Sequence, residues 1–104
     1  MVKAIESYDE FKKLTGGSDV VVVDYWATWC GPCKMISPHF EKMEAKYPNI
    51  KFAKVDVDDQ EQIAQEESIR AMPTFAAYKD GKRIKEFAGA HVQKLTALLD
   101  EVSA

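Results

Sequence analysis

Residues 20–33 read VVVVDYWATWCGPC, and this stretch decides the fold. Its first seven residues are almost all β-branched or aromatic and do not alternate with polar ones, which predicts a strand over Val20 to Trp26 that is buried on both faces. Cys30-Gly31-Pro32-Cys33 follows after Ala27-Thr28-Trp29, so the two cysteines come just after a buried strand and at the start of the next segment.

The next segment has the apolar spacing of a helix, which we expect over residues 33–47. Pro38 inside it removes one backbone hydrogen bond and should kink it. Pro48-Asn49 ends it, and Ile50 to Val57 predicts a second strand. Strand, helix and strand form a βαβ unit, so the two strands should be parallel with a right-handed crossover.

The flanking segments add helices and a hairpin. Ser7 followed by Glu10 is a capping-box pattern that predicts a first short helix, which Gly16-Gly17-Ser18 ends. Asp59 is expected to cap a short helix that extends through Glu67. Residues 74–78 and 83–88 should form two strands joined at Asp80-Gly81, and an amphipathic helix should follow from Val92. Helices on both faces of a mixed sheet are therefore expected.

Length and composition predict one domain over residues 1–104. A net charge of −3 disfavours nucleic acid as a partner. The opening residues lack the apolar run of a signal peptide and no 18-residue apolar span follows, so we expect no membrane association and a cytoplasmic location. Thiols are kept reduced in that compartment, so two cysteines indicate chemistry or metal binding before they indicate structure.

Cys30 and Cys33 have the spacing of a reversible dithiol. Side chains three residues apart on a helical turn come close enough to form a disulfide. The start of a helix has unpaired N–H groups and a positive dipole end, which favour a thiolate. Pro32 suits that position and stiffens the ring between the sulfurs. A zinc site or two inert core cysteines are the alternatives; the first would need ligands from His39 and His91, which lack the spacing.

Asymmetry along the helix predicts the order of the chemistry. Cys30 precedes the helix and should be the exposed, nucleophilic sulfur, while Cys33 should be shielded and resolve the mixed disulfide. Asp24 is the candidate base for Cys33, because burial beside four valines should raise its pKa. Lys54 on the neighbouring strand is expected to pair with Asp24. Side chains that simply reach solvent remain the alternative for both.

Three further places could contact a substrate. Trp29 is a candidate binding platform, with core packing as the alternative. Pro73 donates no hydrogen bond, so the backbone at Met72 could pair with an extended peptide. Gly89-Ala90 would let another chain approach, although an ordinary turn explains the pair nearly as well.

The chain resembles the thioredoxin family along nearly its whole length. The segment from Val22 to Lys34 is similar to the family signature almost end to end. Further similarities follow in the family's order, at Pro38, Lys54-Val55-Asp56-Val57-Asp58, Ala71-Met72-Pro73-Thr74, Asp80-Gly81 and Gly89-Ala90. Tyr25 is a departure, because phenylalanine is commoner there, and a buried hydroxyl at this position needs a partner.

The resemblance implies an α/β structure, the thioredoxin fold, with a central five-stranded mixed sheet flanked by four helices and a cis bond before Pro73. It implies reduction of protein disulfides with no bound cofactor or metal, with electrons arriving from NADPH through thioredoxin reductase. The implied substrates include peroxiredoxins, methionine sulfoxide reductases and ribonucleotide reductase, and the implied state is a monomer.

The resemblance also implies roles for particular residues. Asp24 deprotonates Cys33, and Gly31-Pro32 is the dipeptide of strongly reducing members. The residues implied around the substrate groove are Trp29, Met72, Pro73, Gly89 and Ala90. A non-catalytic binding module and a glutathione-dependent glutaredoxin are the competing functions. Catalysed reduction of a protein disulfide would exclude the binding module. The electron donor, either thioredoxin reductase or glutathione, would distinguish the implied function from that of a glutaredoxin.

Overall fold

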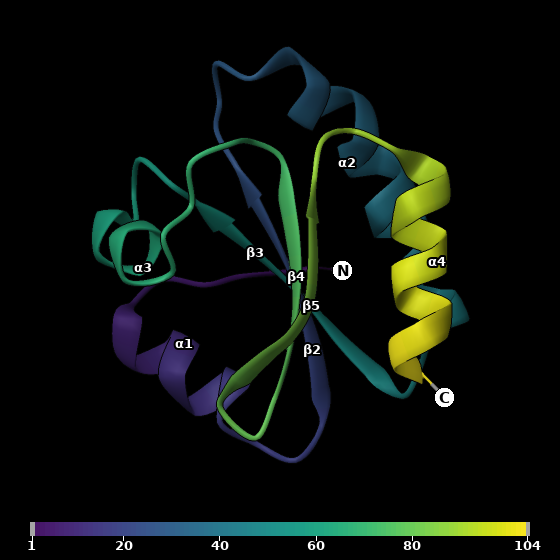
Figure 1. The fold of residues 1–104 in the computed structure, drawn as a ribbon. Helices are drawn as coiled ribbons and strands as arrows, with labels where there is room; N and C mark the ends of the chain where they lie inside the picture. Colours follow the sequence, from purple (N-terminus) through teal and green to yellow (C-terminus); the bar gives the residue numbers. More distant parts are fainter. Residues whose placement is uncertain (1, 104) are drawn as a thin grey trace.

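The strand expected at residues 20–26 is β2 (Val20–Trp26), which lies in the middle of a five-stranded sheet in a computed structural model that describes residues 2–103 (Figure 1). The other elements in chain order are β1 (Lys3–Ala4), α1 (Tyr8–Thr15), α2 (Gly31–Met43), the 3₁₀ turn η1 (Glu44–Lys46), β3 (Ile50–Asp56), α3 (Glu61–Glu66), β4 (Thr74–Lys79), β5 (Lys82–Ala88) and α4 (Val92–Ser103).

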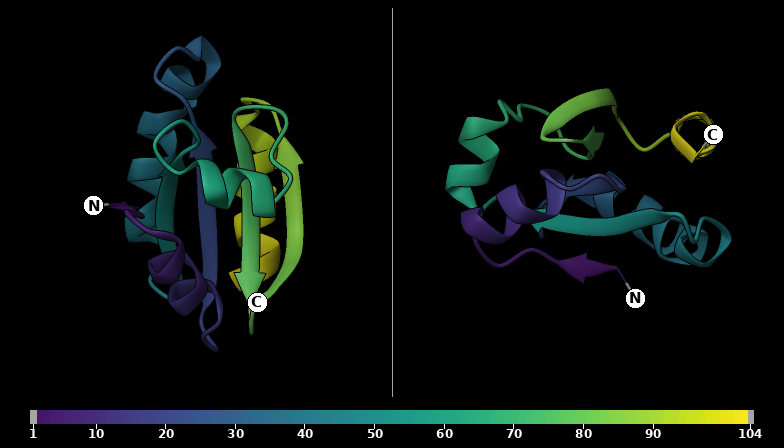
Figure 2. Two further views of the ribbon diagram at one scale, coloured as in Figure 1. Left: turned by 90° about the vertical axis from the view of Figure 1, so that its left-hand side faces the viewer. Right: turned by 90° about the horizontal axis from the view of Figure 1, so that it is seen from below.

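The sheet has the strand order β1-β3-β2-β4-β5. β3 runs parallel to both β1 and β2, whereas β4 is antiparallel to its neighbours β2 and β5. The sheet is therefore mixed, and the five strands and four helices agree with what the resemblance implies. Figure 2 shows helices on the two opposite faces of the sheet.

Alternate residues of β2 pack into two separate cores. Val21, Val23 and Tyr25 belong to the core beneath α1 and α3, whereas Val22 belongs to the core beneath α2 and α4. Burying one valine stabilises the folded chain by about 1.5–3 kcal/mol, and a one-residue slip would exchange the two faces. The register of β2 is therefore fixed, and Asp24 must point to the α2 and α4 side.

The hairpin between β4 and β5 turns at the residues that the sequence indicates. Asp80 and Gly81 have φ of 55° and 78°. Two successive residues in the left-handed region are what a two-residue type I′ turn requires. The backbone N–H groups of both turn residues donate back to the end of α1, at 2.9 Å to the carbonyls of Gly17 and Thr15.

Several expected boundaries were wrong. α2 begins at Gly31, two residues earlier than expected, because Cys30 acts as its N-cap. It ends at Met43 and continues only as the 3₁₀ turn η1. Asp59 does not cap α3: the N-cap residue is Gln60, which makes no side-chain capping bond. β1 was not expected from the residues, because two residues in length are too short to show a periodicity.

Candidate active site

Cys30 and Cys33 form a disulfide at the junction of β2 and α2. Their Cα atoms are 5.3 Å apart, within the range that a disulfide needs. Cys30 is the N-cap of α2 and has extended backbone geometry, and its Sγ accepts a hydrogen bond from the backbone N–H of Cys33 at 3.2 Å. Pro32 lies in the first turn of the helix, as expected. An anion on Cys30 would therefore face both an N–H donor and the positive end of the α2 dipole.

The two cysteines differ little in exposure, although a clear contrast was expected. Cys30 is 5% exposed and Cys33 is 2% exposed, so in the disulfide form both are buried. The expectation that Cys30 is the exposed sulfur is therefore wrong for this form. The two residues pack in a small cluster with Ala27, and Met72 lies against it. What distinguishes the cysteines is the capping position of Cys30 rather than its exposed area.

The segment before β4 lies beside the disulfide. The bond between Met72 and Pro73 is cis, as the resemblance implies. Sγ of Cys30 is 3.7 Å from the carbonyl oxygen of Met72, and because a disulfide sulfur carries no hydrogen this is a van der Waals contact in the oxidised form. Gly89 has φ of 105° and donates its backbone N–H to the carbonyl of Pro73 at 2.8 Å. Ala90, which follows it, is half-buried against the α2 and α4 core.

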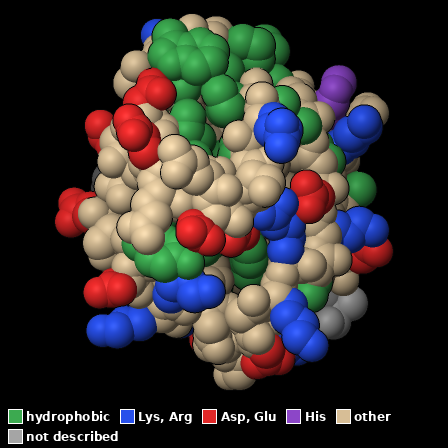
Figure 3. Space-filling view, turned by 60° about the vertical axis from the view of Figure 1, so that its left-hand side comes forward, with side chains coloured by type: hydrophobic (Ala, Val, Ile, Leu, Met, Phe, Trp, Pro, Cys, Tyr) green, Lys and Arg blue, Asp and Glu red, His purple; other side chains and the backbone are tan. Residues whose placement is uncertain are grey.

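Trp29 is the most exposed large hydrophobic side chain among the described residues, at 67%. Its indole Nε1–H donates to Oδ2 of Asp58 at 3.0 Å, which holds the ring in place at the surface. Figure 3 shows hydrophobic side chains gathered at the end of the molecule where α2 begins, with acidic side chains beside them. A fixed, exposed aromatic ring is suited to contact with a partner. Core packing of Trp29 is excluded.

Asp24 is buried, with 3% of its surface exposed, and its Oδ1 has no hydrogen-bond partner among the described residues. Burial raises the pKa of the carboxyl to about 7, an effect that the positive charge of Lys54 opposes and the negative charge of Glu41 reinforces. A carboxyl with this pKa gains and loses a proton near neutral pH. It is therefore suited to proton transfer.

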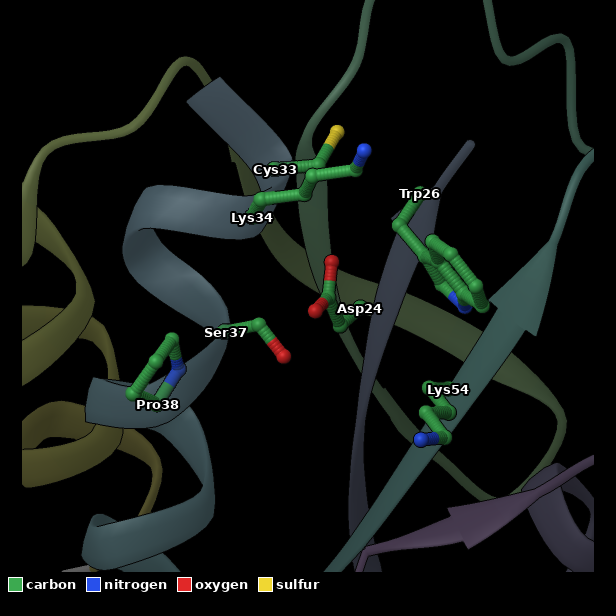
Figure 4. A pocket seen from close by; sticks show the side chains of 7 residues that line it. All are labelled: Asp24, Trp26, Cys33, Lys34, Ser37, Pro38 and Lys54. Atoms are coloured by element: carbon green, nitrogen blue, oxygen red, sulfur yellow. The ribbon is translucent and has the colours of Figure 1, made fainter. Parts of the chain in front are cut away.

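A cavity of about 250 Å³ joins Asp24 to Cys33. It is lined by Asp24, Trp26, Cys33, Lys34, Ser37, Pro38 and Lys54 (Figure 4). In Figure 4 the Asp24 carboxyl lies between α2 on one side and the side chains of Trp26 and Lys54 on the other. Because one water occupies about 30 Å³ of liquid, the cavity is large enough for a water-mediated path between the carboxyl and the sulfur.

The expected pairing of Lys54 with Asp24 was wrong. The two residues are register partners on β3 and β2, as their strands predict. No ion pair joins them within residues 2–103, however, and the Lys54 ammonium lies 5.9 Å from the centre of the Trp26 ring. An ammonium over an indole face is a favourable cation–π contact, so the Trp26 ring competes with the Asp24 carboxyl for the Lys54 ammonium. Lys54 therefore acts on Asp24 only through its charge.

Sequence reasoning missed three residues of the site. Ser37 lines the cavity, Glu41 acts on the Asp24 carboxyl through its charge, and Asp58 holds Trp29. Ser37 and Glu41 follow Cys33 at intervals of four on α2, so helical spacing was a usable signal for both. Asp58 had no such signal, because a loop brings it to Trp29.

The arrangement provides for thiol–disulfide chemistry. Residues 2–103 contain no group of three or more His, Cys, Asp or Glu side chains placed to hold a metal ion. His39 and His91 are both exposed. Nor does that part of the chain contain a helix of the length and apolar character needed to span a membrane. The groups that the structure brings together at this site are the cysteine pair, the Asp24 carboxyl and the cavity that both line.

Comparisons with known proteins agree with this site. The family model named Thioredoxin matches residues 2–102. A thioredoxin from Malassezia sympodialis is 56% identical over 105 residues, which cover 99% of this chain and 100% of that protein. A solved structure of a Malassezia sympodialis thioredoxin has a TM-score of 0.96 at 55% identity, covering 99% of this chain and 94% of that one. The mitochondrial thioredoxin 3 of Saccharomyces cerevisiae, in its oxidised form, has a TM-score of 0.91 at 40% identity over 96% of this chain and 94% of that chain.

The raised pKa of Asp24 predicts how stability depends on pH. Between the ordinary pKa of the unfolded carboxyl and about 7, the folded chain binds more protons than the unfolded chain, so this contribution to stability is present at low pH and is lost as pH rises. Relative to Asp24→Asn, the wild type should lose about 2.5 kcal/mol of unfolding free energy between about pH 5 and 8. Urea unfolding of the oxidised proteins at several pH values measures this difference.

The matched control is Asp59→Asn, which removes an exposed carboxyl. Its unfolding free energy should follow that of the wild type at every pH. Parallel curves for the wild type and Asp24→Asn would show that Asp24 titrates in the folded chain as it does in the unfolded one.

Proposed function

The chain belongs to the thioredoxin family of thiol–disulfide oxidoreductases, which act through a redox-active cysteine pair with no bound cofactor, and from this premise we propose that Cys30 attacks substrate disulfides and Cys33 resolves them. The observation that supports this order is the hydrogen bond from the Cys33 N–H to Sγ of Cys30 at the start of α2. It stabilises a thiolate on Cys30, and Sγ of Cys33, one turn further into the helix, accepts no such bond from any of residues 2–103.

The reaction transfers two electrons from the cysteine pair to the substrate. The Cys30 thiolate attacks one sulfur of the substrate disulfide, which forms a mixed disulfide and releases the other substrate sulfur as a thiolate that takes up a proton. The Cys33 thiol then loses its proton, and its thiolate attacks Sγ of Cys30. The second substrate sulfur leaves as a thiolate, and the Cys30–Cys33 disulfide remains.

Asp24 accepts the proton from Cys33 in this proposal. Both groups line the same cavity, and a pKa of about 7 lets the carboxyl be ionised often enough to accept a proton and protonated often enough to return it. Lys54 keeps the carboxyl from becoming still less acidic, through its charge alone. Gly31 and Pro32 shape the short ring between the sulfurs and so set how readily the disulfide opens.

Five residues form the proposed substrate groove: Trp29, Met72, Pro73, Gly89 and Ala90. Trp29 offers a fixed exposed ring, and the Met72–Pro73 segment lies against Cys30. The Gly89–Pro73 hydrogen bond holds the far side of that segment. A substrate chain that lay along it would bring its disulfide to Sγ of Cys30.

Disulfide-containing proteins and a reductase are the partners of such a protein. We further propose that the reductase is flavin-dependent and draws on NADPH, so that the chain serves as an electron carrier in cell redox homeostasis. The proposed substrates are peroxiredoxins, methionine sulfoxide reductases and ribonucleotide reductase. We place the protein in the cytoplasm, where thiols are kept reduced, as a monomer with residues 1–104 acting as a single domain.

Reductase-coupled turnover tests the proposed function. With NADPH, thioredoxin reductase and insulin, the wild type should oxidise NADPH continuously, because the reductase returns the pair to its dithiol form after each cycle. NADPH absorbance follows this turnover. If turnover instead requires glutathione as the electron donor, the chain is a glutaredoxin. If insulin binds without being reduced, the chain is a non-catalytic binding module.

A trapping experiment tests the roles of the two cysteines. Cys33→Ser should accumulate a stable mixed disulfide on Cys30, because nothing remains to resolve it. Mass spectrometry of peptides after incubation with an oxidised protein substrate identifies the linked residue. Cys30→Ser should capture at least about tenfold less, since its remaining thiol lacks the capping hydrogen bond that stabilises a thiolate on Cys30. A prominent adduct on Cys33 in that variant would reverse the assignment.

Asp24→Asn tests the proton transfer. The variant should fold but resolve the mixed disulfide about tenfold or more slowly near pH 7, with the difference narrowing at higher pH as solvent deprotonates Cys33 directly. Rapid-mixing measurement of substrate-thiol release between about pH 6 and 8 gives the rates, and Asp59→Asn serves as the control. Equal rates for the wild type and Asp24→Asn throughout this range would remove Asp24 from the mechanism.

A further inference from the structure

Tyr25, Tyr78, Glu67 and Arg83 form a hydrogen-bonded network on the α1 and α3 face of the sheet. The hydroxyl oxygens of the two tyrosines are 2.6 Å apart, and the Tyr78 hydroxyl donates to Oε1 of Glu67 at 2.7 Å. Burial raises the pKa of both tyrosines, so both hydroxyls keep their protons. Because the carboxylate can only accept, Tyr25 donates to Tyr78 and Tyr78 donates to Glu67.

Arg83 holds Glu67 at two points. Its Nη2 group donates to Oε1 of Glu67 at 2.9 Å and also to the backbone carbonyl oxygen of Glu67. Both side chains are largely buried, with 23% and 20% of their surface exposed. A guanidinium that donates to the side chain and the backbone of one residue fixes that residue more firmly than a surface ion pair does.

A β-bulge directs Arg83 to this face. In the ladder between β4 and β5, Ala77 pairs with Lys85 and Tyr78 pairs with Arg83, so Ile84 is an extra residue on β5. If Ile84 instead paired regularly with Tyr78, alternation would put Arg83 on the same face as Lys85, which contacts Glu101 of α4 on the opposite side of the sheet. The bulge leaves Ile84 47% exposed and brings Arg83 onto the face of Tyr78 and Glu67.

Glu67 begins the segment that leads to the disulfide. It is the C-cap of α3, and Ser68 after it has φ of 56°, with backbone bonds from Ser68 to Gln65 and from Ile69 to Ala64 that close the helix. Figure 1 shows the chain after α3 rising to the end of the molecule where α2 begins. That segment ends at Met72, against Cys30.

We propose that Arg83 is a positioning residue that, through Glu67, fixes the Ser68–Met72 segment in the place where it contacts protein substrates. This inference rests on the proposed function, in which Met72 and Pro73 form one wall of the groove. The other end of the segment has anchors of its own, from Thr74 Oγ1 to the Ala71 carbonyl and from Gly89 to Pro73. Arg83 supplies the anchor at the start, 16 residues along the chain from Glu67.

Steady-state kinetics with two substrates tests the proposal. Arg83→Met should raise KM for insulin about threefold to tenfold and leave kcat within about twofold, because a less ordered segment weakens contacts with a chain that lies along it. The small disulfide 5,5′-dithiobis(2-nitrobenzoic acid) reaches Cys30 without using the segment, so its kcat/KM should stay within about twofold. Hydrogen exchange should quicken at residues 68–72 and stay unchanged in β2.

Lys85→Met is the matched control. Lys85 lies on the same strand, carries the same charge and forms an ion pair with Glu101, but it contacts nothing in the Ser68–Met72 segment. Its insulin KM should equal that of the wild type. If Arg83→Met and Lys85→Met have equal insulin KM values, or if both substrates are slowed equally in Arg83→Met, the proposal is overturned.

Two tyrosine variants extend the test without changing the charge. Tyr78→Phe removes one of the three bonds to Glu67 and should raise the insulin KM by less than Arg83→Met does, whereas Tyr25→Phe leaves all three bonds to Glu67 and should not change it. If Arg83→Met does not fold, Glu67→Ala takes its place, because it removes the side-chain bonds from both Arg83 and Tyr78, and an unchanged insulin KM in that variant overturns the proposal. A wild type that reduces neither substrate would instead refute the proposed function.

Discussion

The burial of Asp24 in the central strand constrains the rest of the site. The valines before it pack into cores on both faces of the sheet, so the strand can neither shift nor rotate to bring the carboxyl to solvent. Oδ1 is left without a partner, and the pKa rises to about 7. A group that is costly to ionise is thus held in the cavity that it shares with Cys33, the sulfur that loses a proton in the proposed mechanism, and hydrophobic packing keeps it there.

The same strand serves the site on both of its faces. Asp24 points toward α2 and the cavity that it shares with Cys33, while Tyr25 points toward α3 and ends the network that holds Glu67. Neighbouring residues of one strand therefore face the cavity of the proposed proton transfer and the hydrogen-bonded network at Glu67. Because packing on both faces fixes the position of β2, the Asp24 and Tyr25 side chains cannot shift independently of each other.

Residues with local signals could be predicted from the sequence. The strand before Cys30, a helix that starts near Pro32 and the turn at Asp80-Gly81 depend on patterns within a few residues, and the structure confirms the strand and the turn. The resemblance supplied the fifth strand, β1, whose two residues show no periodicity. The pairing of Lys54 with Asp24 was wrong because register does not say which of two neighbours, the carboxyl or the Trp26 ring, a flexible ammonium contacts.

The extra residue in β5 makes the hairpin tolerant of change at that one position. In a regular strand, Arg83 and Lys85 would share a face. The bulge at Ile84 puts them on opposite faces instead. Many side chains are compatible with an exposed bulge, so relatives can vary at residue 84 at little cost. Deletion of Ile84 would make Arg83 and Lys85 consecutive in the chain, so regular alternation would still place them on opposite faces and Arg83 would still face Glu67. A residue added between Arg83 and Lys85 with the bulge retained would instead change which face Arg83 takes.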